Sequence, residues 1–250
     1  MQSFLSVDVL ILAGGKGTRM GSITEKIPKP MVRLGSKPMI LRIMESYSIQ
    51  GFKSFIILTG YKQEIFKDYF SNLLIYGNDI QIDYSKNKIN FFSTNYSDWK
   101  VKVIFTGIES NTGERIKKAQ KFIETDLFHI TYGDGLSNVN LQNLIRIHTE
   151  SDNVLTLTAI NPPTKFGELK LRDNIVEAFE EKPKLSEGFI NGGFMVSNTK
   201  LFKYLGNNQM LEREPMQMLA KENNLGVYKH TGYWQCFDTA KDISQFKEKN

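Results

Sequence analysis

The first 75 residues alternate between nearly continuous apolar runs and segments with helical spacing. Residues 7–13 (VDVLILA) and 54–59 (SFIILT) have the composition typical of strands buried on both faces of a parallel sheet. Apolar residues three and four positions apart predict a helix that begins at Pro38 and ends at Gly51, and another over residues 62–74. The order strand, loop, helix, strand, helix is typical of the start of a doubly wound α/β domain.

Residues 80–105 have a different pattern. Three short β-rich pieces, at 80–84, 89–94 and 101–105, are separated by Asn and Ser. They predict a small β-rich subdomain over about 80–105. Its aromatic residues are either part of a packed subdomain or a contact between subunits, and the sequence leaves both open: Tyr84, Phe91, Phe92, Tyr96 and Trp99.

Beyond residue 105 the chain returns to alternating strands and helices, with no internal repeat and no low-complexity linker. We therefore predict a single domain over residues 1–250. Its fold class is α/β, a doubly wound (Rossmann-like), mixed and mainly parallel sheet flanked by helices. Helices are expected over 112–123, from Leu141, near 212–223 and from Thr239, and strands over 128–132, 154–160, near 168–180, 189–196 and 226–229.

Composition excludes several function classes. The 40% hydrophobic and 24% charged residues are ordinary for a soluble globular chain. The net charge of +5 comes from scattered basic residues, so we expect no nucleic-acid partner. No run approaches the roughly 20 apolar residues of a membrane span, and the N-terminal residues are expected to form a strand and not a signal peptide. Cys236, the only cysteine, excludes an intrachain disulfide and indicates a cytoplasmic protein.

The stretch LAGGKGTRM, residues 12–20, follows the first apolar run. A glycine-rich turn after a strand exposes backbone N–H groups that can bind phosphate oxygens, and Lys16 and Arg19 add positive charge. A simple tight turn would account for the glycines but not for the two cations. The Walker pattern is absent, and the dinucleotide fingerprint fails because Met20 occupies its last glycine position. The stretch therefore predicts a phosphate-binding loop of another kind.

The stretch IPKPM, residues 27–31, places a lysine between two prolines. Prolines restrict the backbone on both sides, so Lys29 is held in a narrower range of positions than a lysine in a flexible loop. On its own, such a lysine is usually a surface residue. Because it follows the glycine-rich loop closely, we expect both to face one anionic ligand.

Two carboxylates follow predicted strands. Asp134 lies in TYGDG and Asp238 in YWQCFDT. Ligands of open α/β sheets bind at the carboxyl ends of strands, and carboxylates beside bound phosphates suggest Mg²⁺ ligation. The alternative is that each residue caps a helix; Asp238, just before Thr239, is placed to cap the last one. The three histidines lack the spacing of a zinc site.

Two later stretches carry polar groups suited to a phosphorylated sugar. FEEKP (residues 179–183) offers Glu181 and Lys182, and NGGF (residues 191–194) offers Asn191 beside two glycines in a strand-like setting. Asparagine and glutamate can hydrogen-bond hydroxyl groups, and a lysine can hold a phosphate.

Taken in order, LAGGKGTRM, PKPM, YGDG, FGEL, EEKP and INGGF resemble the sugar-1-phosphate nucleotidyltransferases, from about residue 7 nearly to the end. Longer stretches such as PPTKFGELKL, EREPMQMLA and GYWQCFDTAKD are most similar to the glucose-1-phosphate cytidylyltransferase branch. The resemblance implies the nucleotide-diphospho-sugar transferase fold, CTP and α-D-glucose 1-phosphate as substrates, and CDP-glucose and pyrophosphate as products. It also implies Mg²⁺ as cofactor, a homo-oligomer, and a role in polysaccharide biosynthesis.

The resemblance implies a role for each matching residue. Arg19, Lys29 and Lys182 would be catalytic, the first two stabilising charge on the CTP phosphates and the third positioning the attacking phosphate. The backbone near Thr112 and Gly113, or near Ala13 and Gly14, is a candidate for recognition of the base. The nucleotide would contact Leu12, Ala13, Gly14, Gly15, Gly17, Thr18, Arg19, Lys29, Thr112, Gly113 and Arg115; the sugar phosphate Tyr132, Gly167, Glu181, Lys182, Asn191 and Gly192; and the metal Asp134 and Asp238.

Other functions stay open at this point. The chain could use UTP or dTTP, or another sugar or polyol phosphate. It could be a non-catalytic sugar-nucleotide sensor, although the intact Lys29, Asp134, Lys182 and Asp238 count against this. A dinucleotide-dependent oxidoreductase is disfavoured by the missing glycine at Met20.

Overall fold

A seven-stranded sheet forms the centre of the protein, for which a computed structural model describes residues 7–161, 168–172, 175–180 and 188–246. Within this seven-stranded sheet, β13 runs antiparallel to both of its neighbours, and the other pairings are parallel. The predicted mixed, mainly parallel sheet is therefore confirmed. The strand order is β14 (Leu225–His230), β10 (Leu155–Ile160), β13 (Ile190–Asn198), β8 (Leu127–Tyr132), β1 (Asp8–Ala13), β4 (Ser54–Thr59) and β7 (Lys100–Phe105).

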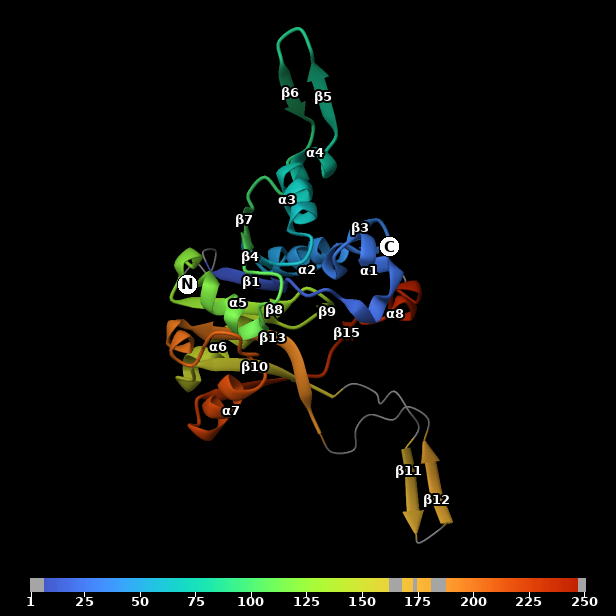
Figure 1. Cartoon of the computed structure of the whole chain (residues 1–250), viewed down its shortest axis with the longest axis vertical. Helices are drawn as coiled ribbons and strands as arrows, with labels where there is room; N and C mark the ends of the chain where they lie inside the picture. Colours follow the sequence, from blue (N-terminus) through green and yellow to red (C-terminus); the bar gives the residue numbers. More distant parts are fainter. Residues whose placement is uncertain (1–6, 162–167, 173–174, 181–187, 247–250) are drawn as a thin grey trace.

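Helices cover both faces of this sheet, as Figure 1 shows. Side chains of β1 alternate between two apolar layers: Val9 and Ile11 enter one, and Leu10 and Leu12 the other. This is why a strand buried on both faces is apolar throughout. The first layer is completed by α2 (Met39–Ser48), α3 (Gln63–Ser71) and α6 (Leu141–Ser151), and the second by α5 (Thr112–Ala119), η5 (Thr199–Lys203) and α7 (Glu214–Lys221).

Within the described part of the chain, no helix has the length and apolar character needed to cross a membrane.

Shorter elements surround the core of the protein. The remaining elements are η2 (Thr18–Met20), α1 (Ser22–Lys26), η3 (Lys29–Met31), β2 (Arg33–Leu34), β3 (Lys37–Pro38), α4 (Leu73–Tyr76), η4 (Gln120–Phe122), β9 (Gly135–Ser137), β11 (Glu168–Arg172), β12 (Ile175–Glu180), β15 (Trp234–Cys236) and α8 (Ala240–Ser244).

The predicted β-rich subdomain at about 80–105 divides into two parts. β5 (Ile80–Asp83) and β6 (Lys88–Phe91) pair as a hairpin that projects beyond α3 and α4 (Figure 1). The strand over 100–105 does not belong to it: β7 pairs with β4 in parallel, Ser54 opposite Lys100, and forms an edge of the central sheet. A short strand pattern does not reveal its pairing partner, so the sequence placed this strand wrongly.

The aromatic residues of this region also divide. Trp99 packs on Phe55, with ring centroids 5.0 Å apart, and donates to Ser48 Oγ at 2.9 Å. In contrast, Tyr84 and Phe92 are 88% and 72% exposed. The packing interpretation therefore holds for the segment that returns to the sheet, and the hairpin leaves apolar side chains in solvent.

Candidate active site

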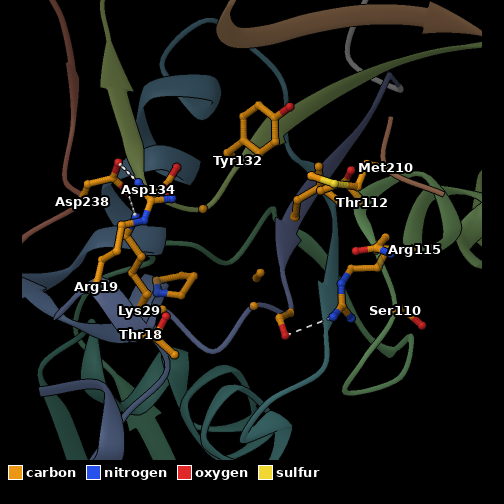
Figure 2. Close-up of a pocket in the computed structure, with 18 residues that line it drawn as sticks. Thr18, Arg19, Lys29, Ser110, Thr112, Arg115, Tyr132, Asp134, Met210 and Asp238 are labelled. Atoms are coloured by element: carbon orange, nitrogen blue, oxygen red, sulfur yellow. Dashed lines mark hydrogen bonds and ion pairs between the residues drawn. The ribbon is translucent and has the colours of Figure 1, made fainter. Parts of the chain in front are cut away.

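A cavity of about 380 Å³ opens at the carboxyl ends of β1 and β8. Loops that follow parallel strands meet at this edge of an open α/β sheet, which is where such folds bind ligands. Figure 2 shows Arg19, Lys29, Asp134 and Asp238 on one side of the cavity and Thr112, Met210 and Arg115 on the opposite side. The lining residues are Leu12, Ala13, Gly14, Gly15, Gly17, Thr18, Arg19, Lys29, Pro30, Ser110, Asn111, Thr112, Arg115, Tyr132, Gly133, Asp134, Met210 and Asp238.

The glycine-rich loop folds back onto the lysine of the PKP stretch. Gly17 has a φ of +65°, a conformation that L side chains rarely adopt. A Cβ atom there would also lie 2.9 Å from Lys29 Cβ. Thr24 Oγ1 donates to the carbonyls of Gly17, at 3.0 Å, and Gly21, at 3.1 Å, which holds the end of the loop. The local sequence thus places the loop and Lys29 against each other.

Lys29 connects the two predicted metal ligands. Its Nζ lies 2.6 Å from Asp134 Oδ2 and 2.6 Å from Asp238 Oδ1, and its side chain is only 11% exposed. Burial by itself would lower the pKa of Lys29, but the two carboxylates outweigh it and hold that pKa above its ordinary value. Lys29 is therefore a buried, charged ammonium group at the cavity wall.

A two-stranded ribbon brings the distant carboxylates together. β9 pairs with β15, so that Gly135 lies opposite Cys236. Asp134 and Asp238 flank this pair, and the N–H of Phe237 donates to the carbonyl of Asp134 at 2.9 Å. The second oxygen of Asp238, Oδ2, accepts from Arg19 Nη1 at 2.6 Å.

The interpretation of Asp238 as a helix cap is wrong. Thr239 is the N-cap of α8: its side chain accepts from the N–H of Asp242 at 3.2 Å, and the Asp242 carboxylate accepts from the N–H of Thr239 at 2.7 Å. This reciprocal pair is a capping box. It uses the residue after Asp238 and leaves the Asp238 carboxylate to contact Lys29 and Arg19.

The donor set fits a hard divalent cation. Oxygen atoms of Asp134 and Asp238 converge on one point, because both contact the same ammonium group. Cys236 Sγ lies within 4.8 Å of a carboxylate oxygen of each residue. Burial, followed by the charges of Asp134 and Asp238, raises the pKa of the Cys236 thiol to about 12, so it stays protonated at neutral pH. Carboxylate oxygens are the ligands that Mg²⁺ prefers.

Arg115 lines the cavity, yet its hydrogen bonds hold protein loops together. Burial lowers the pKa of its guanidinium group, although an arginine stays charged at any ordinary pH. A Cβ atom on Gly14 would collide with this guanidinium group, so the glycine permits the contact. Arg115 donates to the carbonyls of Gly14, Thr59, Gly107 and Ile108 and to Thr106 Oγ1, at 2.6–3.2 Å.

The start of α5 differs from the expected base-reading backbone. The N–H groups of Gly113 and Glu114 both donate to the carbonyl of Gln209, at 3.0 and 3.2 Å. A Cβ atom on Gly113 would lie 2.9 Å from that oxygen. Gly113 therefore permits the close approach of the chain before α7, and it is the one predicted nucleotide contact that does not line the cavity. Thr112 does line it.

Of the predicted sugar-phosphate contacts, three lie within the described residues: Tyr132, Asn191 and Gly192. Tyr132 lines the cavity, and its ring packs on Gly193, where a Cβ atom would lie 2.6 Å from Tyr132 Cδ2. Asn191 and Gly192 lie beside it in β13 but not in the cavity wall; the carbonyl of Gly192 accepts from Trp234 Nε1 at 2.7 Å. The predicted contacts Gly167, Glu181 and Lys182 lie outside the described residues.

Several lining residues were not expected. Ser110 and Asn111 directly precede Thr112, and Gly133 precedes Asp134, so proximity to a predicted residue was the signal that could have found them. Met210 is different. It reaches the cavity because the segment before α7 packs on the start of α5, and no local pattern predicts that contact.

Residues 8–249 match the family described as nucleotidyl transferase. The chain belongs to the nucleotidyltransferase family. The predicted family and enzyme type are thus confirmed. The chain is 40% identical to a probable glucose-1-phosphate cytidylyltransferase of Bacillus subtilis, over 94% of this chain and 92% of the relative. It is 38% identical to the glucose-1-phosphate cytidylyltransferase of Salmonella typhimurium, over 93% and 91%.

Solved structures agree with this nucleotidyltransferase fold. HddC from Yersinia pseudotuberculosis superposes with a TM-score of 0.67 at 26% identity, over 96% of this chain and 97% of that one. A UDP-glucose pyrophosphorylase complexed with UDP-glucose gives 0.68 at 18% identity, over 95% of each chain. At that identity the second match supports the fold alone.

Proposed function

We propose that this nucleotidyltransferase transfers CMP from CTP to α-D-glucose 1-phosphate, giving CDP-glucose and pyrophosphate. The observation that carries the reaction type is the convergence of Lys29, Asp134 and Asp238 beside a glycine-rich loop. The choice of base and sugar rests on the cytidylyltransferases that are 38–40% identical over more than nine-tenths of their length.

The reaction exchanges one phosphoanhydride partner for another. A phosphate oxygen of glucose 1-phosphate forms a bond to the α-phosphorus of CTP, and the bond from that phosphorus to the pyrophosphate oxygen breaks. No general base is needed, because the second pKa of a phosphate monoester is about 6 and the nucleophile is already mostly dianionic at neutral pH. The main obstacle is repulsion between two anions, so the protein has to supply positive charge and alignment.

The cavity wall offers that charge. Lys29 is buried and protonated. Because water screens it less, it attracts a phosphate more strongly than a solvated lysine would. Arg19 has a 75% exposed side chain and is held by one contact to Asp238, so it is able to turn toward a bound triphosphate. Lys182 would hold the attacking phosphate. Removing one such cation is expected to slow turnover about 10²–10³-fold, as for an oxyanion-hole donor.

Asp134 and Asp238 would hold the Mg²⁺ ion. A bound Mg²⁺ offsets negative charge on the phosphates as a Lewis acid. The carboxylates would then shift part of their interaction from Lys29 to the metal, which leaves the ammonium group available to the substrate phosphates. In the same way, Asp238 would contact the metal in place of Arg19, and Arg19 would then be available to the substrate phosphates.

We also propose a homo-oligomer that works in the cytoplasm. The β5–β6 hairpin supports the first point, because it carries Tyr84 and Phe92 at 88% and 72% exposure well away from the sheet. A second copy of this chain would cover them. Size-exclusion chromatography with light scattering tests this, and a Tyr84→Ser, Phe92→Ser variant should shift the mass toward the monomer.

Pyrophosphate release tests the proposed reaction. CTP, UTP, dTTP, ATP and GTP are each combined with a panel of sugar 1-phosphates, with Mg²⁺ or with EDTA, and products are identified by mass spectrometry. The expected result is release with CTP and glucose 1-phosphate that EDTA abolishes. Release with another pair would keep the reaction type and overturn the substrate assignment. No release with any pair would favour a sugar-nucleotide sensor.

A further inference from the structure

Glu212 joins the two sides of the cavity. It lies just before α7, and its carboxylate accepts from two hydroxyl groups on different elements. The phenol of Tyr132, at the end of β8, donates to Glu212 Oε1, and Thr112 Oγ1, at the start of α5, donates to Glu212 Oε2 at 2.6 Å. Both of these residues line the cavity; Glu212 does not.

These contacts determine what each hydroxyl can still do. A hydroxyl group has a single proton to donate, and in both residues that proton is directed at Glu212. Thr112 Oγ1 additionally accepts from the N–H of Leu211 at 2.9 Å. A ligand in the cavity therefore meets Tyr132 as an acceptor only.

The segment around Glu212 is also fastened to α5 by its backbone. The carbonyl of Gln209 accepts from the N–H groups of Gly113 and Glu114, at 3.0 and 3.2 Å. On the other side, the Tyr132 ring is held against Gly193. Figure 2 shows Thr112 and Met210 together, with Tyr132 between them and the side that carries Asp134 and Asp238. A movement of Glu212 would thus move a residue on each side of the cavity.

We propose that Glu212 is a positioning residue that couples the nucleotide side of the cavity, through Thr112, to the sugar side, through Tyr132. It also makes Tyr132 an acceptor for a hydroxyl group of the sugar phosphate. The inference rests on the proposed function for the identity of the two substrates, but the coupling itself is a property of the folded chain.

Glu212→Gln tests the proposal, because an amide keeps the shape but has only one oxygen that accepts. One of the two hydroxyl groups then has to turn or lose its partner. We expect kcat/KM for glucose 1-phosphate to fall about 10–100-fold, the size of a lost hydrogen bond to a charged group. Once Tyr132→Phe is present, adding Glu212→Gln should cost far less than it does in the wild type. Likewise, once Thr112→Val is present, adding Glu212→Gln should change the KM for CTP far less than it does in the wild type.

A matched control lies at the other end of α7, where Glu222 is the C-cap residue. Glu222 accepts from the phenol of Tyr204 at 2.6 Å, the same type of contact, in the exposed part of the protein. Glu222→Gln should leave both KM values unchanged. Wild-type kinetics in Glu212→Gln, or effects that simply multiply in the double variants, would overturn the coupling.

A second measurement does not depend on turnover. Hydrogen–deuterium exchange should be faster in Glu212→Gln at the amides of Gly113, Glu114 and Leu211, and unchanged there in Glu222→Gln. Unaltered exchange at these amides would overturn the proposal even in an active enzyme. If the wild type released no pyrophosphate with any substrate pair but the exchange changed as expected, the proposed function would fail and the coupling would stand.

Discussion

Lys29 Nζ lies at the same distance, 2.6 Å, from a carboxylate oxygen of Asp134 and one of Asp238. The ammonium group thus occupies the point on which these oxygens converge. A divalent cation attracted to the same oxygens has to compete with it. Lys29 is the shared counter-ion of the two carboxylates. Under the proposed function, metal binding would also release it toward the substrates.

Lys29→Met should separate these two roles. Removal of the ammonium group leaves two carboxylates without their shared counter-ion, so Mn²⁺ should bind more tightly in the absence of nucleotide. Turnover should nevertheless fall about 10²–10³-fold, because a cation at the reacting phosphates is lost. Electron paramagnetic resonance of free Mn²⁺ measures the first effect. Lys67→Met, on the exposed side of α3, should change neither quantity, and weaker Mn²⁺ binding in Lys29→Met would contradict the competition.

Asp134→Asn and Asp238→Asn should each weaken Mn²⁺ binding, opposite to the effect of Lys29→Met. Each removes one charged oxygen donor and leaves Lys29 with a single carboxylate partner. Turnover with Mg²⁺ should fall at least about 10²-fold. Isothermal titration with Mn²⁺ provides the measurement, and the exposed Asp126→Asn is the control. Full Mn²⁺ affinity in both variants would mean that the metal is bound elsewhere.

Arg115→Met should mainly reduce stability. Arg115 is only 4% exposed, and without its guanidinium group several loop carbonyls lose a buried donor. Leaving buried acceptors unpaired costs about 1–3 kcal/mol each when no water replaces the donor, so we expect a loss of about 3 kcal/mol or more. Urea unfolding measures it, with Lys117→Met as a control from the same helix. An unchanged midpoint together with a raised KM for CTP would instead make Arg115 chiefly a nucleotide contact.

His129 and His148 should make the protein less stable in mild acid. Burial lowers the pKa of His129 to about 3 and that of His148 to about 4, against an ordinary value of 6.5. Between these values the unfolded chain binds protons that the folded chain does not. Stability is therefore fully present above about pH 6.5 and falls as the pH drops toward 4, by up to about 3 kcal/mol for His129 alone.

Urea unfolding of the wild type and of His129→Phe at pH 7, 5.5 and 4.5 isolates this contribution. His129 packs between the rings of Tyr47 and Phe52, so a phenyl ring is the variant closest in shape. The difference in unfolding free energy between the two proteins should shift in favour of His129→Phe as the pH falls. A difference independent of pH would show that His129 is protonated in the folded state.

Local patterns in the sequence were sufficient for much of the fold. β4 occupies the predicted residues 54–59, and the helix predicted after Pro38 is α2, because burial on one or both faces dictates the spacing of apolar residues. The glycine-rich loop and Lys29 were also predictable. Their chemistry depends on neighbours within about fifteen residues, where a positive φ needs glycine and two prolines restrain a lysine.

The tertiary structure alone decided the rest. Nothing near Asp134 or Asp238 in the sequence indicates that one ammonium group would bridge them; the pairing of β9 with β15 does that. The same holds for β7 at the sheet edge and for Glu212 between Tyr132 and Thr112. The spacing of apolar residues along an element indicates which side of that element is buried, but not which distant element covers it. Contacts between distant segments follow from how the whole core packs, and that is where the site acquires its geometry.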